Sequence, residues 1–297
     1  MAVVNTSLPE LRKRPHWSYS RINALVSHCS LQWAFRYVYF EEPEFTPVSL
    51  VFGSAFHRTA ACIHARLDQG KDVTIREAED MFSDYFRDMN SVSDPEVRYK
   101  ETEKESDLML KGQAMTAVLL ENIDPSQKML GLSVPFTAVL RDRSGEPIRK
   151  PLIGEFDMLV ERGDRTVIVD WKTSAARWSE NRVKNCLQAA CYLYALAEGD
   201  KPERNGCPEP LPGAVVEYVV VTKTKKPVYQ ALNTGRTAED FIRLAEIVRM
   251  LERRIEAEAF YPDNSSSDCA NCPYTRQCRE WHRQTGKKVH VDLRKAA

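Results

Sequence analysis

Two short segments decide how this chain is interpreted, Gly154-Glu155-Phe156-Asp157 and Val169-Asp170-Trp171-Lys172. Apolar residues follow Asp157 and precede Asp170, which is typical of strands buried in a core. Burying a charge in such a strand costs several kcal/mol unless the charge is paired or bound to a metal. The two acids and Lys172 therefore predict a divalent-metal site with a cation beside it, which is the chemistry of phosphodiester hydrolysis.

The two segments are also predicted to lie side by side. Gly163-Asp164 is typical of the turn of a hairpin between strands over residues 152–161 and 166–172. Asp170 and Lys172 stand two positions apart, so their side chains share one face of their strand. The antiparallel neighbour can bring Asp157 across to the same metal. Carboxylates suit Mg²⁺ or Mn²⁺, and the lysine can stabilise charge that develops on a phosphate.

Further candidates lie outside the hairpin. Gln188 and Tyr192 are four positions apart on a helix predicted over residues 179–198, so they share its face and could reach the attacking water, the lysine or a phosphate. His57 lies on a helix predicted over residues 53–66 and could add an imidazole, which suits Mn²⁺ somewhat better than Mg²⁺. His64 lies on the same helical face and is a rival to His57.

The wider pattern predicts an α/β protein in three regions. Residues 1–130 form an N-terminal helical region, residues 131–262 a mixed α/β core, and residues 263–297 a cysteine-rich cap with a basic tail. Helices are predicted from Ser18 or Ser20 and over residues 74–89, 101–122 and 237–260, and strands over residues 132–140 and 214–223. The aromatic run 33–40 could stack nucleic-acid bases, but its spacing favours a core role.

Four segments, in this order, resemble the PD-(D/E)XK nuclease superfamily and specifically its RecB-like branch. They are Gly53-Ser54-Ala55-Phe56-His57, Gly154-Glu155-Phe156-Asp157, Val169-Asp170-Trp171-Lys172-Thr173 and Gln188-Ala189-Ala190-Cys191-Tyr192. The resemblance implies a restriction-endonuclease-like core, with a mixed central sheet flanked by helices, and a Mg²⁺- or Mn²⁺-dependent deoxyribonuclease.

The resemblance also implies roles for individual residues. The implied metal ligands are His57, Asp157, Asp170 and the main-chain carbonyl of Trp171. Lys172 would position the water and stabilise the transition state. Gln188 and Tyr192 would form the QxxxY motif that marks RecB-like members and contacts DNA. The acid of the D-x-K pair is often Glu in this family and is Asp here, but both supply a carboxylate.

The cysteines predict a second inorganic site. Residues 1–15 lack the apolar stretch of a secretory signal, so a disulfide framework is not expected. The spacing of Cys269, Cys272 and Cys278 lets three thiolates converge on one metal or cluster. Cys29 is the best candidate for the fourth ligand, and zinc bound by four thiolates is one possible occupant. The neighbouring histidines, His28 and His282, could substitute for a ligand or border the site.

RecB-like nucleases of the AddB and CRISPR-adaptation types carry one cysteine near the start and three near the end. Those four hold a [4Fe–4S] cluster, and the pattern of this chain is similar. Pro often follows the first cysteine in these families, whereas Ser30 follows Cys29 here. The resemblance therefore implies a cluster that ties the two ends of the chain together.

Composition limits the partners. Lys plus Arg equals Asp plus Glu, 42 each, so a nucleic-acid binder of this charge must rely on local basic patches and bound metal. No apolar run approaches the roughly 20 residues of a membrane span, and a cytoplasmic location is expected. The phosphate loop G-x-x-x-x-G-K-[ST] of a helicase motor is absent from the sequence.

These observations together predict a DNA exonuclease that acts at single-stranded ends, in DNA repair and recombination or in CRISPR spacer acquisition. The size and layout are similar to those of CRISPR-associated RecB-like exonucleases. One alternative is a DNA-end-binding subunit of a larger complex, with an integrase or a helicase and with little activity alone. Another is a scaffold protein stabilised by zinc.

Overall fold

A computed structural model describes residues 6–200, 206–263 and 267–284 of the chain. Its centre is a five-stranded sheet in the order β3-β4-β5-β6-β7, in which only β5 and β6 are parallel. The strands are β3 (Lys128–Ala138), β4 (Leu152–Arg162), β5 (Arg165–Ser174), β6 (Val215–Thr222) and β7 (Tyr229–Thr234). The sheet is therefore mixed, as the sequence predicted for the core.

Helices precede, interrupt and follow this sheet. They are α1 (Leu8–Leu11), α2 (Tyr19–Ser27), α3 (Ser30–Tyr37), α4 (Val48–Asp68), α5 (Ile75–Ser91), α6 (Glu105–Glu121), α7 (Glu180–Lys184), α8 (Leu187–Asp200), α9 (Ala238–Glu256), the 3-10 turn η1 (Ser267–Asn271) and α10 (Thr275–Gln284). A short parallel pair, β1 (Thr46–Pro47) and β2 (Val97–Arg98), joins the start of α4 to the segment before α6. Within the described ranges, no helix has the length and apolarity to cross a membrane.

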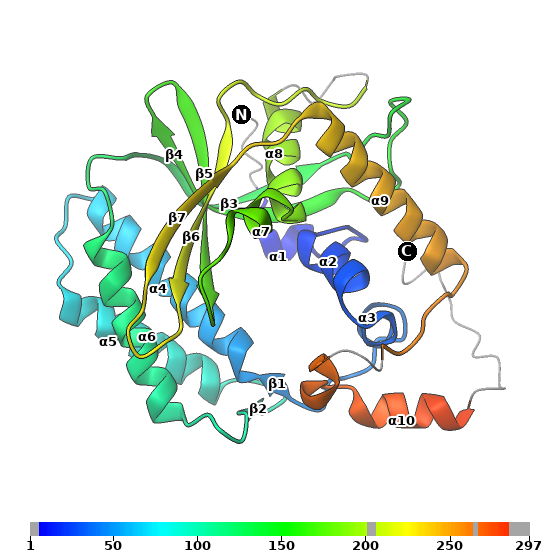
Figure 1. Cartoon of the computed structure of the whole chain (residues 1–297), viewed down its shortest axis with the longest axis horizontal. Helices are drawn as coiled ribbons and strands as arrows, with labels where there is room; N and C mark the ends of the chain where they lie inside the picture. Colours follow the sequence, from blue (N-terminus) through cyan, green and yellow to red (C-terminus); the bar gives the residue numbers. More distant parts are fainter. Residues whose placement is uncertain (1–5, 201–205, 264–266, 285–297) are drawn as a thin grey trace.

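The sheet separates two helical layers (Figure 1). Helices α4, α5 and α6 cover one face, where they pack on Val167, Val169 and Trp171. Helix α8 covers the other face, and α2 and α9 pack against α8, in the core that contains Ile168 and Tyr218. Successive residues of β5 thus point into different layers. Because helices cover both faces of the sheet, β5 is almost continuously apolar.

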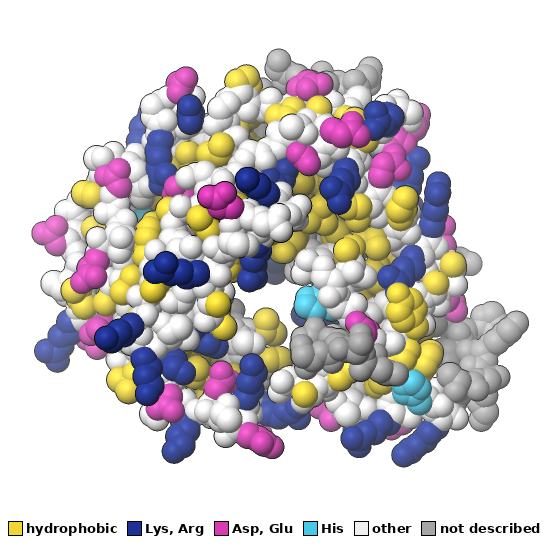
Figure 2. All heavy atoms as spheres, in the orientation of Figure 1, with side chains coloured by type: hydrophobic (Ala, Val, Ile, Leu, Met, Phe, Trp, Pro, Cys, Tyr) yellow, Lys and Arg dark blue, Asp and Glu magenta, His cyan; other side chains and the backbone are white. Residues whose placement is uncertain are grey.

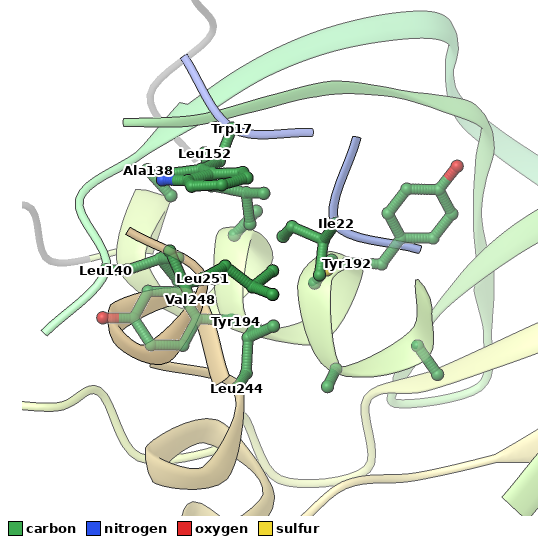
Figure 3. Close-up of a cluster of buried hydrophobic side chains, with 14 of the residues drawn as sticks. Trp17, Ile22, Ala138, Leu140, Leu152, Tyr192, Tyr194, Leu244, Val248 and Leu251 are labelled. Carbon is green, nitrogen blue, oxygen red and sulfur yellow. The ribbon is translucent and has the colours of Figure 1, made fainter. Parts of the chain in front are cut away.

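The layer around α8 and α9 holds a densely packed aromatic and aliphatic core (Figure 3). Trp17 and Tyr194 are buried here among Leu244, Val248 and Leu251. The polar atoms of both aromatic residues have partners, since the Trp17 indole donates to Glu252 at 3.2 Å and the Tyr194 hydroxyl donates to a main-chain carbonyl at 3.0 Å. This core fixes α8 against the sheet.

The C-terminal segment returns to the N-terminal helices. The Ser30 hydroxyl donates to the carbonyl of Tyr261 at 2.9 Å, and the Gln277 amide donates to the carbonyl of Glu42 at 2.8 Å. The rings of Phe35 and Tyr274 lie 5.9 Å apart. Segments from opposite ends of the described chain therefore form one packed unit.

The prediction of one continuous helix over residues 179–198 is wrong. The chain forms α7 and α8 with a break at Asn185 and Cys186. The side-chain amide of Asn185 donates a hydrogen bond to the carbonyl of Asn181 at 2.8 Å, directly after the end of α7. Arg236 then donates to the carbonyls of Val183 and Cys186, at 3.2 and 2.7 Å. A side chain far along the sequence therefore stabilises the break.

Other boundaries also differ from the predictions. Helix α4 begins at Val48, several residues before the expected start, and α8 extends to Asp200. Strand β7 and helix α10 were not predicted. The basic tail from residue 285 onward and residues 201–205 lie outside the described residues.

Candidate active site

The candidate site lies where β4 and β5 stop pairing. Their antiparallel register runs from the turn at Arg162 and Arg165 to Met158 and Val169 and ends there. Beyond that point the side chain of Asp157 accepts a hydrogen bond from the amide of Trp171 at 3.0 Å. A carboxylate thus takes the place of the next strand partner, so Asp157 lies beside the segment that carries Asp170.

Asp170 is held by three side chains. Gln188 Nε2 and the Tyr192 hydroxyl donate to its Oδ1 at 2.9 and 3.0 Å, and Lys172 Nζ forms an ion pair with its Oδ2. Only 1% of the Asp170 side chain is exposed. Gln188 and Tyr192, which could have faced a phosphate or DNA, are buried in this structure and orient a carboxylate.

The charges of the site depend on one another. Burial raises the pKa of Asp170, and the Lys172 ammonium opposes that rise. Burial would lower the pKa of Lys172, but the carboxylates of Asp170 and Asp157 outweigh it and raise the value. Burial would likewise raise the pKa of Asp157, yet the adjacent His57 imidazole holds it below the ordinary value. Each buried charge therefore requires its neighbour.

The structure distinguishes the two histidines of α4. His57 Nδ1 lies 3.1 Å from Asp157 Oδ2, and despite burial the carboxylate raises the pKa of this imidazole. His64 instead stacks on the ring of Trp171, with ring centroids 5.4 Å apart, and burial lowers its pKa to about 4. His57 is thus the histidine that adjoins the acids.

The donor set fits a hard divalent cation. Two carboxylates, the main-chain carbonyl of Trp171 and one imidazole are ligands of the kind that Mg²⁺ and Mn²⁺ accept. Apart from its ion pair with Lys172, Asp170 Oδ2 has no partner among the described residues. Across those same residues, no three His, Cys, Asp or Glu side chains are already arranged around a metal position. His57 and Asp157 face one another instead.

Two residues at the site were missed by the sequence interpretation. Glu155 lies two positions before Asp157 on the same strand, and burial together with the Asp157 carboxylate raises its pKa. Tyr218 of β6 stands in register with Asp170 and is fully buried. Period-two spacing could have identified Glu155. No sequence signal aligns β6 with β5, so Tyr218 could not have been placed.

The four expected cysteine ligands line one cavity of about 130 Å³. Cys29 precedes α3, Cys269 lies in η1, Cys272 directly follows η1, and Cys278 lies on α10. Burial raises the pKa of Cys272 and of Cys278, and the neighbouring thiols raise both further. The raised pKa values favour neutral thiols at Cys272 and Cys278, and a bound cation or cluster would favour the thiolate form instead.

An opening lies beside the candidate site. In Figure 1, the ends of β5 and β6 and helix α4 lie on one side, and α2 and α3 lie on the other. Figure 2 shows that side chains leave a gap through the molecule at this place in the view. Asp170 and Lys172 belong to the C-terminal half of β5, the strand that ends at this border.

The sequence and the fold were compared with known proteins. A family model described as the PD-(D/E)XK nuclease superfamily matches residues 16–279. A crystal structure of a protein from Eubacterium rectale, named "Putative exonuclease", covers 99% of this chain and 98% of its own, with 14% identity and a TM-score of 0.50. A crystal structure of SSO0001 covers 87% and 92%, with 13% identity and a TM-score of 0.31. No curated protein sequence matches the chain.

Proposed function

The chain belongs to the PD-(D/E)XK nuclease superfamily, and we propose that it is a Mg²⁺- or Mn²⁺-dependent DNA exonuclease of the RecB-like branch. One observation carries the proposal. Asp157, Asp170 and Lys172 come together where β4 and β5 separate. Gln188 and Tyr192 support it further, because they hold Asp170 from the following helix at the spacing of the QxxxY motif.

Within this proposal each side chain has a distinct task. Asp157, Asp170 and the carbonyl of Trp171 would hold the divalent ion, with His57 beside them. The ion would polarise the phosphate and lower the pKa of a bound water. Gln188 and Tyr192 fix Oδ1 of Asp170, so Oδ2 is the oxygen that would hold the cation. Lys172 keeps a positive charge close to the oxygens on which charge develops.

The opening supports a preference for ends. A strand that reaches the site through a gap between two parts of the molecule enters by its terminus (Figure 2). A single strand fits such a path more readily than an internal stretch of duplex. We therefore propose single-stranded DNA, or duplex with free ends, as the substrate.

Digestion of end-labelled DNA tests the proposal. Labelled single-stranded and duplex DNA are incubated with the protein in Mn²⁺, Mg²⁺ or EDTA, beside Asp170→Ala and Lys172→Ala. We expect metal-dependent shortening that both variants lose. Asp164→Asn, an exposed position in the turn of the same hairpin, is the matched control and keeps full activity. Absence of cleavage by folded protein that still binds DNA ends would favour a binding subunit.

The four cysteines carry a second part of the proposal, a structural [4Fe–4S] cluster. Their approach to one cavity from both ends of the described chain supports it. Protein purified without oxygen is expected to absorb visible light and to contain iron and inorganic sulfide. A colourless protein with stoichiometric zinc would contradict the cluster and support zinc bound by four thiolates, because zinc thiolates have no redox or d–d chemistry.

The proposed biological setting follows from the proposed substrate. We place the enzyme in the cytoplasm, in DNA repair and recombination or in CRISPR spacer acquisition. The helical region 1–130, the nuclease core 131–262 and the cap 263–297 would be parts of one nuclease unit. Copurification with an integrase would favour spacer acquisition, and copurification with a helicase would favour repair.

A further inference from the structure

The ammonium of Lys172 faces an aromatic ring as well as a carboxylate. Lys172 Nζ lies 6.0 Å from the centroid of the Tyr218 ring. Tyr218 stands on the neighbouring parallel strand in register with Asp170, so both side chains lie on the same side of the sheet. A cation over an aromatic face is attracted to it, and more strongly where water is excluded. Tyr218 is fully buried, so its ring is shielded from water.

The hydroxyl of Tyr218 does not explain why an aromatic residue occupies this position. It has no strong hydrogen-bond partner within the described residues, because the Cys186 thiol beside it is a weak donor and a weak acceptor. A buried hydroxyl with so weak a partner costs free energy that phenylalanine would avoid. The useful part of the side chain at this point is therefore the ring.

The Tyr218 ring packs against Trp178, which is itself held by hydrogen bonds. Trp178 packs against Tyr218 with centroids 5.3 Å apart. The main chain of Trp178 exchanges hydrogen bonds of 2.9 and 3.3 Å with the Gln230 side chain, and its indole donates to Ser174 at 3.2 Å. The Arg182 guanidinium lies 4.0 Å from the Trp178 ring on the outer side. A series of ring and cation–π contacts thus leads from Lys172 through Tyr218 and Trp178 to the exposed Arg182.

Asp170 alone cannot hold Lys172 throughout a reaction. Its Oδ1 is occupied by Gln188 and Tyr192, so Oδ2 serves Lys172 here and is also the oxygen left for a divalent ion. An oxygen shared with such an ion attracts the ammonium less strongly. The face of Tyr218 does not depend on that oxygen.

We propose that Tyr218 is a positioning residue whose ring face keeps the Lys172 ammonium in place while Asp170 is engaged with the divalent ion. The inference rests on the proposed nuclease function, because it assigns Tyr218 a part in that reaction. Trp178 fixes the orientation of the ring. The ring acts through Lys172 rather than as a ligand of the metal.

Two substitutions separate the ring from the hydroxyl. Tyr218→Phe keeps the ring and is expected to keep kcat. Tyr218→Leu removes the ring and is expected to lower kcat about tenfold, the rate equivalent of a buried cation–π contact. KM, and DNA binding in EDTA, should not change. Phe241→Leu, which removes a buried aromatic ring from α9, controls for general loosening of the core and keeps kcat.

A second measurement does not depend on activity. In metal-free protein, the ε-methylene protons of Lys172 should show an upfield ring-current shift in NMR spectra of the wild type and Tyr218→Phe, and lose it in Tyr218→Leu. If Tyr218→Leu does not fold, Tyr218→Met fills more of the space without an aromatic face and serves instead. Equal kcat for the ring-bearing and ringless variants, or equal loss in both, would overturn the inference. Activity that survives Asp170→Ala would overturn the nuclease assignment instead.

Discussion

Two tyrosines on α8, Tyr192 and Tyr194, are both buried, but only Tyr192 reaches the candidate site. Its hydroxyl is one of two donors to Oδ1 of Asp170. The hydroxyl of Tyr194 instead donates to the carbonyl of Val139 and accepts from the amide of Arg141. The pair allows the orientation of Asp170 to be tested separately from the stability of α8.

Tyr192→Phe is expected to lower kcat by about tenfold to a hundredfold, because a buried carboxylate loses one of its two neutral donors. KM should change little. Tyr194→Phe should lower the free energy of unfolding by about 1 kcal/mol and leave kcat unchanged. Steady-state kinetics and urea denaturation of both variants make the comparison. Equal losses of kcat would show that α8 acts only through stability.

His64 gives a pH dependence of stability with a definite sign. Burial holds its folded-state pKa at about 4, below the ordinary 6.5. Between these values the unfolded chain binds a proton that the folded protein does not, so stability falls as the pH drops from 6.5 toward 4. The contribution at pH 5 is about 2 kcal/mol. His64→Phe keeps a ring against Trp171 and should remove this part of the loss.

Urea denaturation of the wild type and of His64→Phe at pH 7, 6 and 5 measures this effect. The difference between the two free energies of unfolding should shift in favour of the variant as the pH falls. Carboxylates that titrate below pH 5 affect both proteins alike and cancel. A constant difference across this range would contradict a buried neutral imidazole at position 64.

At the scale of elements, α5 and α6 pack closely because one position carries no side chain. A Cβ at Gly112 would overlap the ring of Phe82, which lies fully buried against it. Gly112→Ala is therefore expected to lower the free energy of unfolding by about 1–3 kcal/mol. At Gly199 on α8 a Cβ would meet nothing within 4 Å.

Gly199→Ala is the matched control, and thermal denaturation compares the two variants. Since alanine favours helix over glycine by up to about 1 kcal/mol, this variant should be as stable as the wild type or more stable. Equal destabilisation of both variants would mean that the overlap with Phe82 is not the cause of the stability loss in Gly112→Ala.

Elements with strong local patterns could be predicted from the sequence. Strand β5 follows from its apolar run, and α9 from its amphipathic spacing and the capping box at Thr237. Strand β7 was missed because it lies at the edge of the sheet and is mostly polar and partly exposed. The break between α7 and α8 was missed because Arg236, which supports it, lies far along the chain.

Part of the candidate site could likewise be predicted from the sequence, and part could not. The approach of Asp157 and Asp170 could be predicted because one short hairpin joins their strands. Their exact partners could not, since Gln188 and Tyr192 could equally have faced outward from α8. Tyr218 could not be assigned, because pairing of parallel strands depends on the whole fold rather than on local sequence.

At the scale of the molecule, the cysteine-lined cavity joins the N-terminal helices to the C-terminal segment. Cys29→Ala is expected to lower the free energy of unfolding by about 4 kcal/mol in the cluster-loaded protein, by analogy with a covalent link that closes a long loop. Cys62→Ala, on α4 away from the cavity, should have a much smaller effect. Denaturation with iron analysis under anaerobic conditions compares them. Equal stability of the Cys29 variant and the wild type would contradict the proposal that the cluster links the two segments.

The pairing of the two ends of the described chain also has a consequence during synthesis. Ser30 and Phe35 leave the ribosome long before Tyr261 and Tyr274, which cover them, because 231 positions separate Ser30 from Tyr261. A nascent chain must therefore carry an uncovered apolar surface on α3 while all the residues between α3 and Tyr261 are made. Because exposed surface of this kind promotes aggregation, a stalled or shortened product is a natural client for chaperones and proteases.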